Sequence, residues 1–239
     1  ANRGKEAIVN LLTEEFRSVG HALRDDMGTD LYGDGTGNGN KDLYGLVAQV
    51  DDGTNVGTFQ GLSRTTYTTL QSQYNVQAGA LALSDLATSY DGAQIGYDQP
   101  TLGVTTPAVF SIIEALYTST TRYQYVQGIA ERIKVTAAGV EKGGVTGNLG
   151  FTGIMYRGMP IIIDDKCPSG NLFMLNENYI DLYEMPADLN FVSGTQDAFS
   201  WTGWKKSPNQ DVIVSQLLWY GQLVGTEPRK HARRVTITS

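Results

Sequence analysis

The sequence has little of the chemistry on which enzymes, metalloproteins and secreted proteins depend. It contains one cysteine, Cys167, and two histidines, His21 and His231, among 239 residues. A single cysteine excludes an intramolecular disulfide framework and is typical of synthesis in a reducing cytoplasm. The sequence has no His-x-x-x-His or Cys-x-x-Cys pattern, so no metal site of that kind is predicted.

Long apolar runs and excess positive charge are also missing. The isoleucines at 161–163 are among the longest apolar runs, far short of the roughly 20 residues that a membrane span needs. No signal segment opens the chain. Its 18 Lys and Arg against 25 Asp and Glu give a net charge of -7, so any contact with nucleic acid is expected to be weak and non-specific. The chain starts at Ala1 and enters a predicted helix directly, so we expect that a preceding segment was removed by processing or by design.

No catalytic, cofactor-binding or metal-binding residue is predicted. Neither histidine has a Ser or Cys nucleophile nearby at the spacing of a known signature. Asp164 and Asp165 are adjacent, so a strand would point them to opposite faces, whereas paired acid-base catalysis needs convergent carboxyls. Cys167 follows in the same predicted turn and is interpreted as an incidental, exposed thiol. The expected function is therefore not enzymatic.

A glycine-rich segment, GDGTGNGN at residues 33–40, is predicted to be a structural turn. A dinucleotide fingerprint needs a strand before the glycines and a helix directly after them, and here a helix precedes. Part of the segment is similar to a calcium loop, with candidate ligands at Asp34, Thr36, Asn38, Gly39 and Asp42. The twelfth position is Gly45, where a bidentate Glu is required, so calcium is not predicted.

The clearest predicted element is an amphipathic helix over residues 5–27, about 35 Å long. Apolar residues recur every three or four positions on one stripe, namely Ile8, Leu12, Phe16, Val19, Leu23 and Met27. The stripe is narrow, so we expect the helix to lie across a sheet and to end at Gly28.

Shorter elements follow in an order that predicts an α+β fold with at least one antiparallel sheet. Helices are expected over residues 43–50, 78–90 and 107–117, the last with Pro107 in its first turn. Strands are expected over residues 100–104, 159–163, 172–175 with an extension to 183, 211–225 and 235–238. A buried helix is the alternative for 211–225, residues 64–74 are either strand or irregular, and 122–150 remain ambiguous.

Residues 229–234 (RKHARR) form the one dense basic stretch. It is interpreted either as a solvated chain end or as a contact with the acidic surface of a neighbouring copy or with enclosed nucleic acid. The sequence leaves these alternatives open.

Four segments in order resemble the major capsid proteins of tailed bacteriophages, the Hong Kong 97 type of fold. The long helix, followed by GDGTG (33–37) and LYGL (43–46), resembles the family's spine helix and glycine-rich turn. VTTPAVF (104–110) is similar to the strand and helix of its axial domain. GIMYRGMPII (153–162) before Leu172 resembles its hairpin, and residues 209–221 before Pro228 resemble its last long strand.

This resemblance implies a long spine helix, a peripheral antiparallel sheet and a mixed axial domain. The implied layout is a peripheral domain at 1–41, an axial domain at 42–171, a second peripheral segment at 172–218 and a return to the axial domain at 219–239. The family's N-terminal arm and extended loop have no counterpart here, and no residue pair can be matched to its covalent cross-link.

The implied function is structural. Copies would form pentamers and hexamers of an icosahedral phage head around double-stranded DNA, assembled in the bacterial cytoplasm and retained in the virion. Scaffolding, portal and decoration proteins are possible partners, and no membrane or cofactor is implied. The alternative is an encapsulin-type compartment that encloses cargo protein. A hydrolase or a carbohydrate-binding module rich in Tyr and Gly is a more distant alternative.

Overall fold

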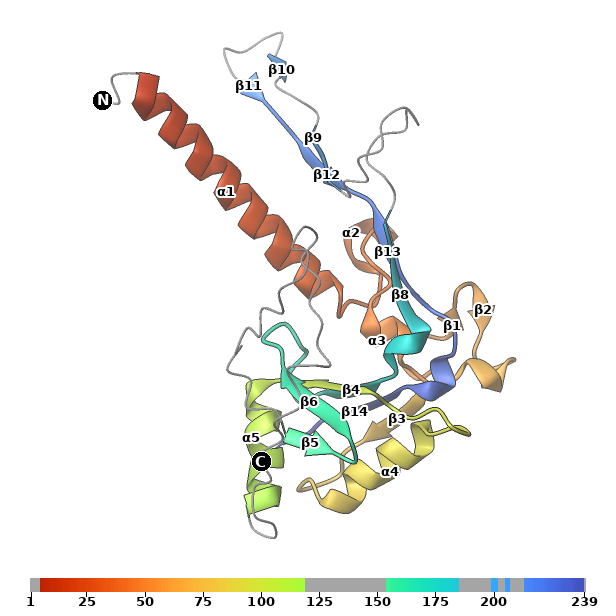
Figure 1. Cartoon of the computed structure of the whole chain (residues 1–239). Helices are drawn as coiled ribbons and strands as arrows, with labels where there is room; N and C mark the ends of the chain where they lie inside the picture. Colours follow the sequence, from red (N-terminus) through yellow and green to blue (C-terminus); the bar gives the residue numbers. More distant parts are fainter. Residues whose placement is uncertain (1–4, 119–153, 185–198, 202–204, 207–212, 239) are drawn as a thin grey trace.

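The computed structural model describes residues 5–118, 154–184, 199–201, 205–206 and 213–238. These residues form a six-stranded sheet with helices packed on it, a long helix and a two-stranded ribbon. The helix and the ribbon both extend away from the sheet in Figure 1. The ambiguous stretch at 122–150 lies outside the described residues. No described helix has the length and apolar character needed to cross a membrane.

Helix α1 (Lys5–Asp30) has 26 residues and is about 39 Å long. It continues beyond Gly28, where an end was predicted. Val19, on the predicted apolar stripe, is 49% exposed, and the described side chains from Arg17 to Ala22 are all exposed. The prediction that the apolar stripe lies buried across a sheet is therefore wrong for Val19, whereas Leu23 and Met27 are half-buried. For Ile8, Leu12 and Phe16 the prediction falls outside the described side chains.

The six-stranded sheet is mixed, and its strands come from distant parts of the chain. Its order is β3 (Gln73–Val76), β14 (Ala232–Val235), β7 (Leu172–Leu175), β4 (Leu102–Thr105), β6 (Met159–Ile163) and β5 (Ile154–Tyr156). β14 is parallel to β3 and antiparallel to β7, and β4 is parallel to β6 and antiparallel to β7. The predicted antiparallel pairing is confirmed, with parallel pairs added. The bounds predicted for β6 and β7 match the structure.

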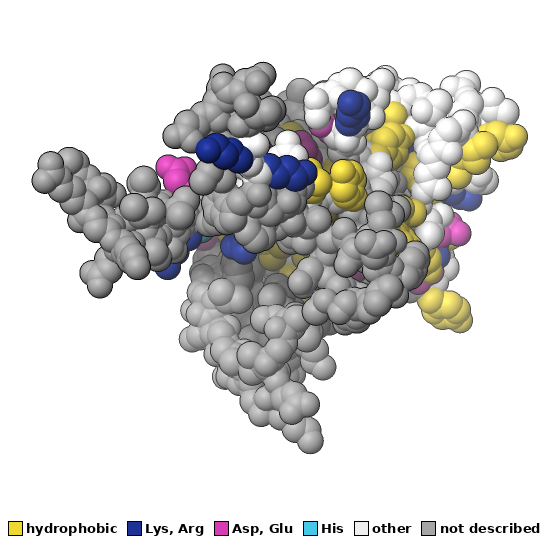
Figure 2. All heavy atoms as spheres, turned by 90° about the horizontal axis from the view of Figure 1, so that it is seen from above, with side chains coloured by type: hydrophobic (Ala, Val, Ile, Leu, Met, Phe, Trp, Pro, Cys, Tyr) yellow, Lys and Arg dark blue, Asp and Glu magenta, His cyan; other side chains and the backbone are white. Residues whose placement is uncertain are grey.

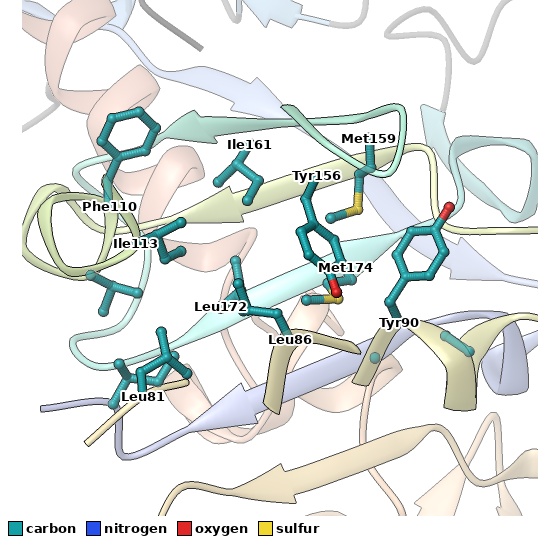
Figure 3. Packing of buried hydrophobic residues seen from close by; sticks show 14 residues of the cluster. Leu81, Leu86, Tyr90, Phe110, Ile113, Tyr156, Met159, Ile161, Leu172 and Met174 are labelled. Atoms are coloured by element: carbon teal, nitrogen blue, oxygen red, sulfur yellow. The ribbon is translucent and has the colours of Figure 1, made fainter. Parts of the chain in front are cut away.

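Each face of the sheet carries its own apolar core, because side chains alternate along a strand. Leu172 and Met174 of β7 belong to one cluster, which helices α4 (Leu83–Ala93) and α5 (Pro107–Thr118) cover with residues such as Leu86 and Ile113 (Figure 3). Phe173 and Leu175 of the same strand point into the second cluster, against α3 (Leu46–Gln49) and the residues just beyond α1. The two clusters make this sheet the structural centre of the described chain.

The helix boundaries follow their end groups. α5 begins at Pro107 as predicted, and the Thr106 hydroxyl accepts a hydrogen bond from the Val109 amide at 3.4 Å. α4 begins five residues later than predicted, where the Asp85 carboxylate accepts a hydrogen bond from the Ala82 amide. α3 is a single turn within the predicted 43–50.

Short elements connect these larger ones. They are α2 (Gly37–Asn40), the hairpin of β1 (Thr58–Phe59) and β2 (Leu62–Ser63), and the 3-10 turns η1 (Thr68–Leu70), η2 (Glu177–Tyr179) and η3 (Pro228–Lys230). The open question over residues 64–74 is therefore answered by irregular chain and a 3-10 turn leading into β3.

The ribbon consists of three antiparallel pairs. β8 (Ile180–Glu184) pairs with β13 (Gly221–Gly225), β9 (Phe199–Trp201) with β12 (Leu217–Trp219), and β10 (Lys205–Lys206) with β11 (Ile213–Val214). Of the strand predicted over 211–225, the described residues 213–225 are extended, and the helical alternative is wrong for them. It is divided into three because each part pairs with a different partner segment.

The last strand also differs from its prediction. β14 spans Ala232–Val235, three residues earlier than the predicted 235–238. Thr236 adopts a φ of 58°, a left-handed conformation in which a strand cannot continue. β14 therefore contains Arg233 and Arg234 of the basic stretch and only Val235 of the predicted strand.

Candidate functional site

The histidines and acidic residues that were considered and rejected as catalytic lie in different environments. His21 lies on the exposed surface of α1, whereas His231 is 1% exposed at the start of β14. Asp164 accepts hydrogen bonds from the Tyr32 hydroxyl at 2.6 Å and from the Lys166 amide at 2.9 Å. This carboxylate therefore connects the segment after α1 to the turn between β6 and β7. Within the described ranges, no group of three or more His, Cys, Asp or Glu side chains could hold a metal ion.

Cys167 is buried, and its interpretation as an exposed thiol is wrong. The side chain is 5% exposed and packs in the second cluster with Tyr32 and Phe173. Burial raises the pKa of the thiol to about 12. Because the thiolate is the nucleophile, this cysteine is unreactive near neutral pH.

The glycine-rich segment forms a turn that returns the chain to the end of α1. Asp34 accepts hydrogen bonds from the amide and the hydroxyl of Thr36, at 3.0 and 2.7 Å, and these bonds lower the pKa of Asp34. The Leu46 amide then donates to the Leu31 carbonyl at 2.7 Å. A Cβ atom on Gly45 would lie 2.4 Å from that same carbonyl oxygen, so no larger residue fits there. The position that fails as a calcium ligand is thus one that the packing requires to be glycine.

Both interpretations of the basic stretch are wrong for its last two arginines. Arg233 and Arg234 are 8% and 5% exposed within β14. The Arg234 guanidinium faces α4, donating to the Ser89 hydroxyl at 3.0 Å, to the Gln77 side chain at 2.6 Å and to the Asp85 carbonyl at 2.6 Å.

Arg233 points to the opposite face. It donates to the Asn171 side-chain oxygen at 2.9 Å and lies over the rings of Tyr74 and Phe173. Lys230 binds Asp98 and the Tyr179 hydroxyl. Arg229 is exposed, so for that residue the alternatives stay open.

Sequence reasoning missed a buried polar cluster around Arg64. The Arg64 and Asp51 side chains are both fully buried and lie 3.6 Å apart. The guanidinium also donates to four backbone carbonyls, those of Ala48, Gln49, Val56 and Leu70. Asp51 accepts from the backbone amides of residues 53, 55 and 56. No local pattern signals this pair, because its partners are mainly backbone atoms.

The strongest functional feature is exposed apolar surface on the ribbon. Five large apolar side chains there are at least 36% exposed, on both faces of the ribbon, and they are called the ribbon surface below: Leu182, Tyr183, Val214, Leu217 and Tyr220. Seen from above, Figure 2 shows hydrophobic side chains open to solvent on the described surface. A two-stranded ribbon is at best marginally stable alone, so its exposed apolar side chains are candidates for contact with another protein. The ribbon surface is therefore the candidate site.

A polar hollow of about 400 Å³ lies beside the edge strand β3. Its lining includes Asp52, Thr68, Gln71, Tyr74 and Arg229. Small-molecule sites are usually lined mainly by apolar side chains. This hollow differs from them, and the hydrolase and carbohydrate-binding alternatives gain no support from it.

Comparison with known proteins places the fold among shell-forming proteins of the Hong Kong 97 type. The structure matches a chain of the Cyanophage A-1(L) capsid asymmetric unit with a TM-score of 0.64 and 17% sequence identity, over 93% of this chain and 70% of that one. It matches the holo-SrpI encapsulin complex from Synechococcus elongatus PCC 7942 with a TM-score of 0.60 and 16% identity, over 95% of this chain and 65% of that one. No protein-family model and no curated protein sequence matches the chain. The mixed helix-and-sheet fold is thus that of viral capsid and encapsulin shells.

Proposed function

We propose that this chain is the shell-forming part of a tailed-bacteriophage major capsid protein. Copies would associate side by side into pentamers and hexamers, which tile an icosahedral head around double-stranded DNA. In this proposal the function lies in how copies pack together to form a shell, and not in catalysis. Many weak contacts repeated in a closed symmetric array give a stable assembly.

The observation that carries this proposal is the shared fold, together with the exposed apolar side chains of the ribbon. Likeness at 16–17% identity supports the fold alone. The ribbon surface adds an independent argument, since its tyrosines Tyr183 and Tyr220 are 62% and 57% exposed. Aromatic side chains are enriched in protein interfaces, which is consistent with contact between copies.

The proposed domain layout follows the family. α1 acts as the spine helix of a peripheral domain (1–41) that is completed by a second segment (172–218). The axial domain (42–171) is completed by residues 219–239. The six-stranded sheet supports a slightly different boundary, because β7 lies in its middle and belongs structurally with the axial part.

An encapsulin-type compartment is the second candidate, and the similarity to the encapsulin shell favours it about equally. The two differ in what the shell encloses and in their partners. A phage capsid would meet scaffolding, portal and decoration proteins and end in the virion after assembly in the host cytoplasm. An encapsulin would enclose protein and stay in the cell.

Electron microscopy of the full-length protein, purified from expressing cells, tests the shell proposal. Uniform closed shells, or rings of five and six copies, are the expected result. A protein that stays monomeric across concentration and salt conditions contradicts it. Nuclease-protected DNA inside the native particles supports the capsid, and a protein cargo supports the compartment.

A further inference from the structure

The long helix α1 is attached to the rest of the described chain near its C-terminal end. The described side chains from Arg17 to Ala22 are exposed, and partial burial begins only at Leu23. Beyond the helix, Tyr32 is 5% exposed, with its ring 5.8 Å from that of Phe173 in β7. Among the described side chains of α1, those that pack on the rest of the chain therefore lie close to this end.

Two polar contacts at this end come from one short turn, residues 164–167, between β6 and β7. The Tyr32 hydroxyl donates to the Asp164 carboxylate at 2.6 Å. Two residues further along the turn, the Lys166 ammonium forms an ion pair with Asp25 of α1. Gly28 faces the same lysine, and a Cβ atom there would lie 3.3 Å from its side chain.

The turn itself is fixed to the sheet. The Asp164 amide donates to the Thr105 carbonyl of β4 at 2.9 Å, and the Asp164 carboxylate accepts from the Lys166 amide. Cys167, at the other end of the turn, is buried in the second apolar cluster. A displacement of the turn would disturb β4 and that cluster together.

The two contacts are well placed to resist rotation. Asp25 lies near the C-terminal end of α1, and Tyr32 lies two residues beyond the end of the helix at Asp30. One attachment point would leave α1 free to pivot, whereas a second contact on the segment directly after the helix restricts that rotation. Because α1 is about 39 Å long, a rotation of about 5° at this end moves the far end by about 3 Å.

We propose that the 164–167 turn is the joint that fixes the angle between α1 and the six-stranded sheet, and that the Asp25–Lys166 and Tyr32–Asp164 contacts thereby set the curvature of the assembled shell. The curvature part rests on the proposed shell function. In a closed array the angle between neighbouring copies decides how many copies close it. A helix direction that varies would give particles of varying diameter.

The joint is tested in the full-length protein with Lys166→Met, Tyr32→Phe and the double variant. Tyr32→Phe keeps the ring that packs on Phe173 and removes only the hydroxyl. Lys166→Met removes an ammonium whose side chain is 27% exposed, from an ion pair in which the Asp25 side chain is 64% exposed. If the double variant does not fold, this single variant still tests the joint. Arg157→Gln is the matched control, because it removes an exposed ion pair with Asp91 between α4 and the β5–β6 hairpin.

The angle is measured by double electron–electron resonance between spin labels at Val19→Cys on α1 and Tyr97→Cys, whose native side chains are both exposed. The buried Cys167 is expected to stay unlabelled. We expect a narrow distance distribution for the parent and for Arg157→Gln, and a shifted or at least twofold broader one for Lys166→Met and the double variant. Unchanged distributions in these variants would overturn the joint.

Cryo-electron microscopy of the same preparations gives the particle diameters. The double variant is expected to form particles with a wider range of diameters than the parent. Uniform parental diameters despite a changed label distance would overturn the link to curvature. If the parent forms no shells at all, the proposed function fails, while the label distances still decide the joint.

Discussion

Arg64 and Asp51 form an ion pair in which both side chains are completely buried, with 3.6 Å between nitrogen and oxygen. The pair organises residues 48–70, since Arg64 donates to the carbonyls of Ala48 and Leu70 at the two ends of this segment. Burial lowers the pKa of Arg64, yet four carbonyls and the Asp51 carboxylate stabilise its charged form. Such a pair is costly to break from one side, because the remaining charge stays buried without its partner.

We therefore predict that Arg64→Met lowers the free energy of unfolding by about 3–5 kcal/mol. Urea denaturation of the unassembled protein, followed by circular dichroism, measures the change. Arg157→Gln serves as the control, because its ion pair with Asp91 is exposed at 45% and 56% and such pairs contribute at most about 1 kcal/mol. Equal losses for the two variants would show that the buried cluster does not stabilise the fold.

Acid should weaken the fold through His231. Its Nδ1 atom accepts a hydrogen bond from the Asn176 amide at 3.1 Å, and burial lowers its pKa from 6.5 to about 4. Between these values the unfolded chain binds a proton that the folded chain does not. Stability from this residue is thus complete above pH 6.5 and is lost as the pH falls toward 4, by up to about 3 kcal/mol.

His231→Asn tests this, because the amide oxygen of Asn can accept the same hydrogen bond without titrating in this range. The melting temperature of the variant, measured from pH 7.5 to 4.5, should fall less steeply than that of the parent. His21→Asn on the exposed helix surface is the control and should keep the parental slope. If His231→Asn also keeps that slope, the acid sensitivity arises elsewhere.

Disrupting the ribbon surface should affect assembly more than folding. Tyr183→Asp places a charge on a side chain that is 62% exposed in the single chain. Such surface substitutions usually change stability by less than about 0.5 kcal/mol, whereas a charge in an apolar contact between copies weakens it. We predict at least about a tenfold rise in the concentration needed for assembly, equivalent to about 1.4 kcal/mol per contact.

Light scattering against protein concentration measures this change, with melting temperature as the check on folding. Tyr67→Asp is the control, since this tyrosine is 52% exposed but lies outside the ribbon. Assembly of Tyr183→Asp at the parental concentration would remove Tyr183 from the interface.

Thr236 should be a position where substitution stabilises the protein. It is exposed and has a φ of 58°, which is unfavourable for a β-branched residue. Asn tolerates this conformation better, so Thr236→Asn is expected to raise stability by about 0.5–1 kcal/mol. The increase should appear as a higher melting temperature, and Thr238→Asn, also exposed, should leave it unchanged. A lower melting temperature for Thr236→Asn would mean that the threonine side chain makes a stabilising contact.

Local signals in the sequence predicted the elements that depend on local chemistry. Pro107 and Thr106 determine where α5 begins, and the apolar runs of β6 and β7 gave their bounds correctly. The stripe on α1 predicted a helix correctly. It could not predict what covers the apolar side, because that depends on contacts outside the helix.

The buried polar groups were beyond local signals for the same reason. Arg233 and Arg234 look like part of a solvated basic tail, yet their partners Asn171, Ser89 and Gln77 lie 62, 145 and 157 positions away. Cys167 looked exposed because it lies in a polar turn, and the packing of that turn against β7 buries it. Only the tertiary fold supplies these partners.

The place of β14 in the sheet has a consequence for the timing of folding during synthesis. β14 separates β3 from β7, and it follows both of them in the chain. It is translated about 160 residues after β3, so at about 5–20 residues per second the earlier strand waits roughly 8–30 s for its neighbour. Until then β3 has no strand to pair with in this sheet, and β7 is unpaired on the side that β14 will occupy. Unpaired strand edges can pair with other chains, so the nascent chain is most exposed to wrong association before β14 is made.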